Sequence, residues 1–246
     1  MKWKKAAKRL GAFGAVILAT ALVWTWWGRS QQQAAFSTCR MPGEVLVIDP
    51  GHGGEDGGAV SATGQPESQI NLAIGLRLDA LMGFYGVETV MTRTEDVSIY
   101  DSNASTLREK KVSDIHNRVA LVESLTNPTL ISIHQNSFPE TRYHGTQVFF
   151  VNESLSLPLA QGVQNLIKEA IDPHNNRTPL KIPSSVYLMN HISCRAILVE
   201  CGFLSNPEEE EQLRDADYQK KLAMTLGAAY LTSQQGETPL GEVPIT

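Results

Sequence analysis

Cysteine is scarce in this chain, and its scarcity excludes one kind of metal site. The 246 residues contain Cys39, Cys194 and Cys201, and no two of them form a C-x-x-C pair. Structural zinc sites are usually built from such closely spaced cysteines, so a zinc knuckle is excluded. Cys194 and Cys201 could form a disulfide, but we favour the alternative that both are small apolar residues in or beside a strand.

Positive charge is also scarce beyond the N-terminus. The net charge is −5, and no cluster of lysine and arginine appears after residue 30. Proteins that bind nucleic acid through its phosphates carry a basic patch, so the sequence predicts no nucleic-acid partner. A glycine-rich stretch at residues 51–58 lacks the lysine and hydroxyl residue that complete a phosphate-binding P-loop. That class of nucleotide site is therefore excluded as well.

A long apolar run occurs once, near the N-terminus. Residues 10–27 are uncharged and end in Trp24, Trp26 and Trp27, and a group of lysines and an arginine precedes them. The run is just long enough to cross a bilayer, and the positive flank should stay in the cytoplasm. We therefore expect residues 1–28 to form a membrane anchor, with everything after them outside the cytoplasm. A cleaved signal peptide is the alternative, although no clear small-x-small cleavage site follows the run.

The rest of the chain divides into three parts. Residues 29–42 are polar and lack periodicity, which is typical of a linker. Residues 233–246 contain glycine and proline breaks and few apolar side chains, so we expect a disordered tail. Residues 43–232 are then the folded body. The chain is 42% hydrophobic, which is ample for one core, and it shows no internal repeat.

Strands and helices alternate along the body. Apolar or alternating runs predict strands at 45–48, 87–93, 129–137, 145–151 and 196–202. Helical spacing predicts helices over 67–82, 112–125, 157–171 and 218–231, and a short acidic helix capped by Asn206 and Pro207. Polar segments at 95–111 and 174–185 are expected to be loops. This order predicts an α/β fold, a three-layer sandwich with a mostly parallel central sheet flanked by helices.

Polar residues follow three of these strands where the apolar run ends: His52, His134 and Glu200. Ligands of open α/β sheets bind beyond the carboxyl ends of the strands, so we expect the three on one rim. Glu67 adds a second carboxylate in the first turn of a helix, where the helix dipole favours an anion. Two imidazoles and one carboxylate leave a fourth zinc position open, which is typical of a hydrolytic site. The remaining carboxylate can then take a proton from water.

Each of these residues also has a purely structural interpretation. Glu67 could serve only the start of its helix, and His134 could bond to a backbone carbonyl. Glu200 is harder to explain in this way, because a carboxylate at the end of a buried strand is costly unless it is paired or functional. Of the other histidines, His191 is a candidate for contact with substrate rather than for metal ligation. The four together favour the functional interpretation.

Three further residues closely follow the predicted rim residues His134 and Glu200 in the sequence. Asn136 and Ser137 follow His134 and are candidates for contact with substrate or for support of the metal ligands. Cys201 follows Glu200, and because side chains alternate along a strand it should face the opposite side of the sheet. It is therefore excluded from the predicted ligand set.

The rim residues belong to four motifs that resemble a known enzyme family. The motifs are Asp49-Pro-Gly-His-Gly-Gly54, Glu67, Ser132-Ile-His-Gln-Asn-Ser137 and Leu198-Val-Glu-Cys-Gly-Phe-Leu-Ser-Asn206. In this order, and over residues 44–232, they resemble the zinc-dependent N-acetylmuramoyl-L-alanine amidases of the Amidase_3 type. The resemblance implies that His52, Glu67 and His134 bind one zinc ion and that Glu200 is the catalytic glutamate. Gln135 stands where the family often has leucine, a change that should leave ligation intact.

Within this family the chain is most similar to the germination-associated amidases of the spore cortex in endospore-forming bacteria. The resemblance implies extracytoplasmic hydrolysis of the amide between N-acetylmuramic acid and L-alanine in peptidoglycan, as a step toward muramic-δ-lactam. It also implies a partner deacetylase and, for some members, a lipoprotein activator. The alternatives are a general vegetative cell-wall autolysin, another zinc peptidase of peptidoglycan, and a wall-binding homologue without catalysis.

Overall fold

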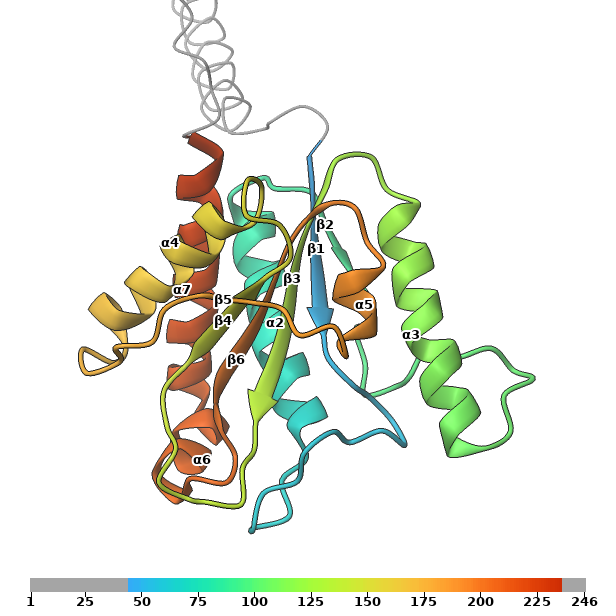
Figure 1. Ribbon diagram of the computed structural model, residues 1–246, viewed down its shortest axis with the longest axis horizontal. Coiled ribbons are helices and arrows are strands. Elements are labelled where there is room, and N and C mark those ends of the chain that lie inside the picture. Colours follow the sequence, from blue (N-terminus) through green and yellow to red (C-terminus); the bar gives the residue numbers. More distant parts are fainter. Residues whose placement is uncertain (1–43, 236–246) are drawn as a thin grey trace, which may run out of the picture. The chain divides into compact units, whose positions relative to one another are not determined.

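The structure is a computed structural model that describes residues 44–235 (Figure 1). The predicted anchor at 1–28, the predicted linker at 29–42 and residues 236–246 of the predicted tail lie outside the described residues. Within the described part, no helix combines the length and the apolar character that crossing a membrane requires.

A six-stranded sheet in the order β2-β1-β3-β6-β4-β5 forms the middle layer. Its strands are β1 (Val45–Pro50), β2 (Thr89–Met91), β3 (Pro128–Asn136), β4 (Gln147–Phe150), β5 (Leu180–Lys181) and β6 (Arg195–Phe203). β2, β1, β3 and β6 are parallel to one another, whereas β4 is antiparallel to β6 and pairs in parallel with β5. The predicted mostly parallel sheet is confirmed.

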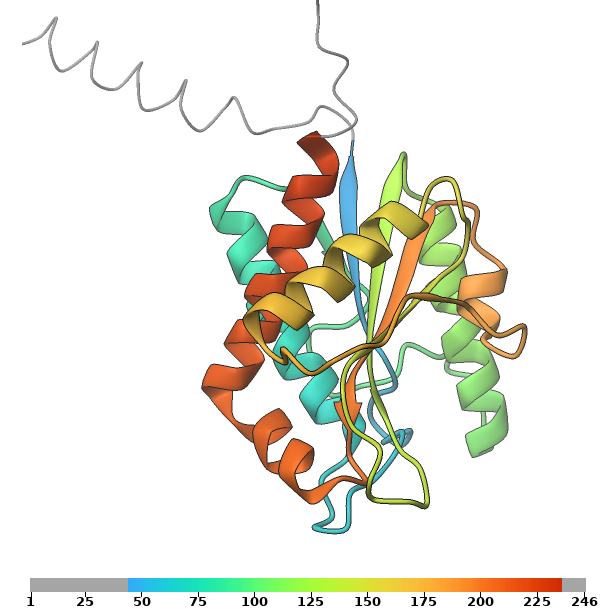
Figure 2. The same cartoon turned by 60° about the vertical axis from the view of Figure 1, so that its left-hand side comes forward.

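Helices cover both faces of this sheet (Figures 1 and 2). One face carries α2 (Glu67–Phe84), α4 (Leu157–Ala170) and α7 (Ala216–Gln235). The other carries α3 (Leu107–Glu123) and α5 (Tyr187–Asn190). The short helix α6 (Pro207–Arg214) follows β6 at the end of the sheet to which the arrow of β3 points (Figure 1). The three-layer sandwich expected from the sequence is confirmed.

Alternate residues of the central strands enter two separate cores. Leu46 and Ile48 of β1 pack with α2, α4 and α7, whereas Val47 packs with the α3 and α5 layer. In β6, Cys201 lies in the first core and Leu198 in the second. Because side chains alternate along a strand, Glu200 shares the face of Leu198. The face covered by α3 and α5 is therefore the one that carries the predicted chemistry, and Cys201 points away from it, as expected.

The segment 95–111, predicted to be a loop, is helical from Leu107 onward. Thr106 and Glu109 form a capping box, in which the Thr106 hydroxyl accepts from the Glu109 amide and the Glu109 carboxylate accepts from the Thr106 amide. This pair satisfies two amides of the first turn that would otherwise lack partners. The spacing Thr-x-x-Glu was visible in the sequence and marks where the helix begins.

Other boundaries differ because tertiary contacts decide them. The predicted loop at 174–185 contains β5, which is two residues long and exists because it pairs with Phe149 and Phe150 of β4. The helix α5 was not predicted, because four residues carry too little periodicity. The last helix continues past Thr232 to Gln235, beyond the expected end of the body. Cys194 and Cys201 are both free, so the disulfide alternative is wrong.

Candidate metal centre and active site

His52 lies in the turn that follows β1, in an unusual backbone conformation. Its φ is 62°, in the left-handed region that side chains other than glycine seldom adopt. Its Nδ1 lies 2.9 Å from Oδ2 of Asp56, and its Nε2 lies 3.4 Å from Oε1 of Glu67. A carboxylate on one ring nitrogen fixes the tautomer of a histidine and leaves the other nitrogen free to bind a metal. Asp56 therefore orients His52.

Glu67 is the first residue of α2 and is only 3% exposed. Its Oε2 accepts a hydrogen bond of 2.8 Å from the Ala59 amide, and its Oε1 accepts from the Gln135 amide and the Asn71 side chain. Burial would raise the pKa of Glu67, but His134, His52 and the Ala59 amide lower it to about 2. The carboxylate is therefore ionised at neutral pH and held in one position.

His134 completes the group from β3. Its Nδ1 lies 2.8 Å from Oε1 of Glu67, and its ring centroid lies 5.0 Å from that of His52. Burial lowers the pKa of His134, but the hydrogen bond and charge of Glu67, together with the charges of Glu200 and Asp49, outweigh burial and raise it. One potential ligand atom from each of His52, Glu67 and His134 lies within 4.8 Å of the other two. The three residues converge, as the sequence predicted.

Two glycines make this convergence sterically possible. A Cβ on Gly51 would lie 2.1 Å from Cε1 of His134, and a Cβ on Gly58 would lie 2.6 Å from Oε2 of Glu67 and 2.7 Å from Cδ2 of His52. Contacts under 3.0 Å force a shift of the neighbouring atoms. At Gly51 and Gly58 the candidate ligands therefore occupy the space that a larger residue's side chain would need.

Glu200 lies beside His134 in the sheet, because the register of β3 and β6 pairs these two positions. Its Oε2 is buried and has no hydrogen-bond partner among the described residues. Burial raises the pKa of Glu200 to about 7. The negative charge of Glu67 adds to this rise, whereas His134 and His52 oppose it. A buried carboxylate oxygen without a partner is costly, and Glu200 also lines a cavity, so this position indicates a group that meets a ligand from outside the chain.

A cavity of about 230 Å³ opens at these strand ends and brings His52, His134 and Glu200 to one surface. The apolar part of its lining comes from α3, β6 and the segment that forms α5: Ile115, Leu198, Val186, Leu188 and Met189. Lys111 of α3 also lines it, with its Nζ 2.7 Å from Oδ1 of Asp56. The cavity thus combines a charged floor with an apolar wall.

The structure leaves three predicted contact residues outside the lining of this cavity. Asn136 accepts a hydrogen bond from the amide of exposed Ser137. His191 is exposed and stacks on Tyr187, with ring centroids 3.7 Å apart. In contrast, Asp56 was not predicted, although its place four residues after His52 in a tight glycine-rich loop was a usable signal.

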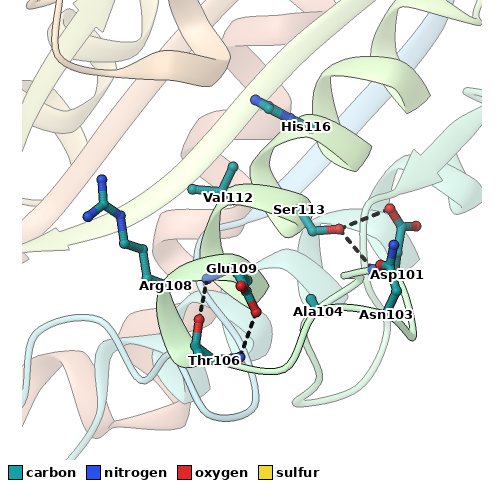
Figure 3. A pocket seen from close by; sticks show the side chains of 9 residues that line it. All are labelled: Asp101, Asn103, Ala104, Thr106, Arg108, Glu109, Val112, Ser113 and His116. Carbon is teal, nitrogen blue, oxygen red and sulfur yellow. Dashed lines mark hydrogen bonds between the residues drawn. The ribbon is translucent and has the colours of Figure 1, made fainter.

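A second hollow of about 650 Å³ lies beside the first turns of α3 (Figure 3). It shares no lining residue with the cavity at the strand ends. Its two carboxylates accept hydrogen bonds from nearby residues: Glu109 accepts from the Thr106 amide and Asp101 accepts from the Ser113 hydroxyl (Figure 3). These bonds fasten the start of α3 to the preceding loop, so we assign this hollow no part in the chemistry.

The chain matches the Amidase_3 family, described as N-acetylmuramoyl-L-alanine amidase, over residues 46–230. The germination-specific N-acetylmuramoyl-L-alanine amidase of Bacillus subtilis (strain 168) is 29% identical over 202 residues, which cover 81% of this chain and 84% of that protein. The CwlD amidase of Clostridioides difficile, solved in complex with the GerS lipoprotein, superimposes with a TM-score of 0.75 at 33% identity and covers 79% of this chain and 100% of that one. For the amidase AmiC2 of Nostoc punctiforme the TM-score is 0.65 at 31% identity, with coverage of 78% and 97%.

Proposed function

This chain belongs to the Amidase_3 family and is an N-acetylmuramoyl-L-alanine amidase, and we propose that it works with one zinc ion bound by His52, Glu67 and His134. Glu200 is the catalytic acid and base of this proposal. The bond cleaved is the amide between the lactyl carboxyl of N-acetylmuramic acid and L-alanine of the stem peptide. The family resemblance expected from the four motifs is confirmed, and these residue roles build on it.

One observation carries the proposal: two histidines and a glutamate converge within 4.8 Å, next to Glu200, whose buried Oε2 has no hydrogen-bond partner among the described residues. Two imidazoles and one carboxylate form a ligand set used by catalytic zinc sites, which keep a further position open. Asp56 fixes the ring of His52 in the way that metal-binding histidines are usually supported. The donor atoms present therefore fit zinc.

When bound, zinc would lower the pKa of a water molecule and polarise the scissile carbonyl. Glu200 accepts a proton from the attacking water while the oxygen of that water adds to the carbonyl carbon. The bond between carbonyl carbon and nitrogen then breaks, and Glu200 returns the proton to the leaving alanine nitrogen. A pKa of about 7 suits a group that must both take up and release a proton near neutral pH.

The cavity supports this assignment of the substrate. The lactyl group and L-alanine each carry a methyl group close to the scissile amide. The apolar wall formed by Ile115, Leu188 and Met189 can receive such methyl groups, while the polar floor faces the amide. Burial is also the largest cause of the raised pKa of Glu200.

The biological setting is proposed from the relatives. A germination-specific amidase and an amidase solved with a lipoprotein are among them, so we place this enzyme in maturation of the spore cortex, with a lipoprotein as activator. We further propose that its action, together with that of a partner deacetylase, leads to muramic-δ-lactam. The enzyme would act outside the cytoplasm and be attached to the membrane through residues 1–28. Residues 29–42 would then link that anchor to the catalytic domain at 43–232.

The test combines metal content with analysis of the reaction products. The purified full chain should contain about one zinc per molecule and release intact stem peptides with a free N-terminal alanine from purified peptidoglycan, detected by mass spectrometry. Glu200→Gln should keep its zinc and lose activity by about 10²–10⁴-fold, the range for loss of a general acid or base. Release of single amino acids or cleavage inside the stem peptide would show a different peptidase.

A matched control is Glu169→Gln, on the exposed side of α4 in the layer across the sheet. It makes the same chemical change and should leave both zinc content and product release unchanged. The proposal fails if Glu200→Gln turns over at the rate of Glu169→Gln. It fails equally if the wild-type chain cleaves peptidoglycan at an undiminished rate after its metal has been removed by a chelator.

A further inference from the structure

We infer that Arg118, a residue of α3, is a positioning residue of the metal centre. It holds the turn that carries His52, so the affinity for zinc depends on it although it is not a ligand. This inference rests on the proposed zinc site and extends it to a helix in the next layer of the fold.

Arg118 is only 1% exposed and is among the largest fully buried side chains of the molecule. Its Nη1 donates to Oδ1 of Asp49 at 2.5 Å, and its Nε donates to Oδ2 of Asp114 at 2.8 Å. Asp49 in turn accepts hydrogen bonds from Thr92 and Ser132. A buried charge requires this degree of compensation, so the guanidinium is held in one place beneath the end of β1.

The same guanidinium donates to the backbone of the metal-binding turn. Nη1 donates to the carbonyl of Pro50 at 3.1 Å, and Nη2 donates to the carbonyl of His52 itself at 2.8 Å. From another direction, Arg93 donates to the carbonyls of Pro50 and Gly51. Three consecutive carbonyls are thus held by two arginines. Arg118 is the one of the two that holds the residue bearing the candidate ligand.

The conformation of His52 explains why such support is needed. At φ 62° a histidine is held in a left-handed conformation that an unsupported chain would leave for a more favourable one. The glycines that follow supply no side chains to hold this geometry, so hydrogen bonds to the backbone of the turn contribute to it. If the carbonyl of His52 is released, its imidazole can turn away from Glu67 and His134.

A lysine at position 118 would retain the charge but not the function. A lysine ammonium is a compact point charge, whereas the guanidinium offers a planar fork of five donors and here reaches two carboxylates and two carbonyls. A lysine can therefore satisfy the ion pair with Asp49 while losing the bond to His52. Comparing lysine with arginine at position 118 therefore distinguishes a residue that holds the turn from one that only neutralises the buried charge of Asp49.

The experiment measures zinc affinity of the full chain by competition with a chromogenic chelator, for the wild type, Arg118→Lys and Arg118→Met. Loss of support for a ligand typically weakens metal binding by about 10–100-fold, and we expect Arg118→Met to fall in this range and Arg118→Lys to lie between it and the wild type. A second readout is the visible absorption spectrum of the cobalt-substituted protein. It should shift in Arg118→Lys, because the position of the His52 imidazole changes.

Ile167→Ala is the control for general loss of stability, because Ile167 is fully buried in the core on the opposite face of the sheet. It should lower the melting temperature and leave zinc affinity and the cobalt spectrum unchanged. If Arg118→Met does not fold, the folded Arg118→Lys decides the question. Wild-type affinity and an unshifted spectrum in Arg118→Lys would overturn the inference, whereas a wild-type chain that binds no zinc would overturn the proposed function instead.

Discussion

Substitution of one loop glycine tests whether the proposed metal centre is as tightly packed as its geometry indicates. Gly58 has φ 69°, and a Cβ there would lie within 2.7 Å of two candidate ligands, Glu67 and His52. An alanine pays about 1–2 kcal/mol for the left-handed conformation. Crowding of well-packed neighbours adds about 1–3 kcal/mol. For a domain of this size, each kcal/mol lowers the melting temperature by about 2–4 °C.

The chain supplies a matched control for the crowding. Gly64 has φ 88° but nothing within 4 Å of the position of its missing Cβ. Gly64→Ala should therefore lose only about 1–2 kcal/mol of stability, which the left-handed backbone conformation causes. Gly58→Ala should lose more stability and, because both ligands must shift, should also bind zinc about tenfold or more weakly.

Two measurements on both variants decide the outcome: thermal unfolding followed by circular dichroism, and zinc affinity by competition with a chelator. We expect Gly64→Ala to keep the zinc affinity and peptidoglycan hydrolysis of the wild type. We expect Gly58→Ala to bind zinc more weakly and to hydrolyse peptidoglycan more slowly. Equal zinc affinity in the two variants would refute the reasoning. It would mean that Glu67 and His52 can yield to a methyl group without loss of the site.

Three further predictions concern Asp56 and Asp49 near the site and Thr106 at the start of α3. Asp56→Asn should weaken zinc binding by about 10–100-fold with little change in melting temperature, because the carboxylate that orients His52 is lost; unchanged affinity in the chelator assay would contradict that role. Burial would raise the pKa of Asp49, but Arg118, Ser132, His134 and Thr92 lower it to about 2 from 3.8. Its contribution of about 2 kcal/mol is therefore present above pH 4 and lost as the pH falls from about 4 to 2, so urea unfolding of Asp49→Asn should depend less on pH in that window; an equal slope would exclude this account. Thr106→Ala should cost about 1 kcal/mol by removing the cap of α3 and leave zinc affinity unchanged, and a variant as stable as the wild type in urea would contradict the cap's contribution.

The class of fold, and the meeting of the predicted strand-end residues at one edge of the sheet, were predictable from the sequence because both depend on local patterns. Apolar runs that end in a polar residue mark parallel strands and their carboxyl ends, and these ends meet along one edge of a sheet whatever the details of packing. His134 and Glu200 are neighbours for this reason. Cys201 could likewise be assigned to the opposite face, because alternation along a strand is a property of the backbone.

Elements that depend on partners distant in sequence were not predictable. β5 is two residues long and exists through its pairing with β4, and α5 is four residues long, so neither has a pattern of its own. The residues that support the proposed metal centre likewise depend on contacts distant in sequence. Arg118 lies 66 positions from the carbonyl that it holds, and in sequence it is one arginine of a polar helix.

By itself, the sequence determined which residues stand at the ends of the strands, and hence which groups could meet at one edge of the sheet. The tertiary structure alone decided how those groups are held: His52 by Asp56 and by the guanidinium of Arg118, and Glu67 by amides from two other segments. The physical reason is that strand ends follow from local periodicity. The precise orientation of an imidazole or a carboxylate is determined by hydrogen bonds and close contacts with residues that come together only when the chain has folded.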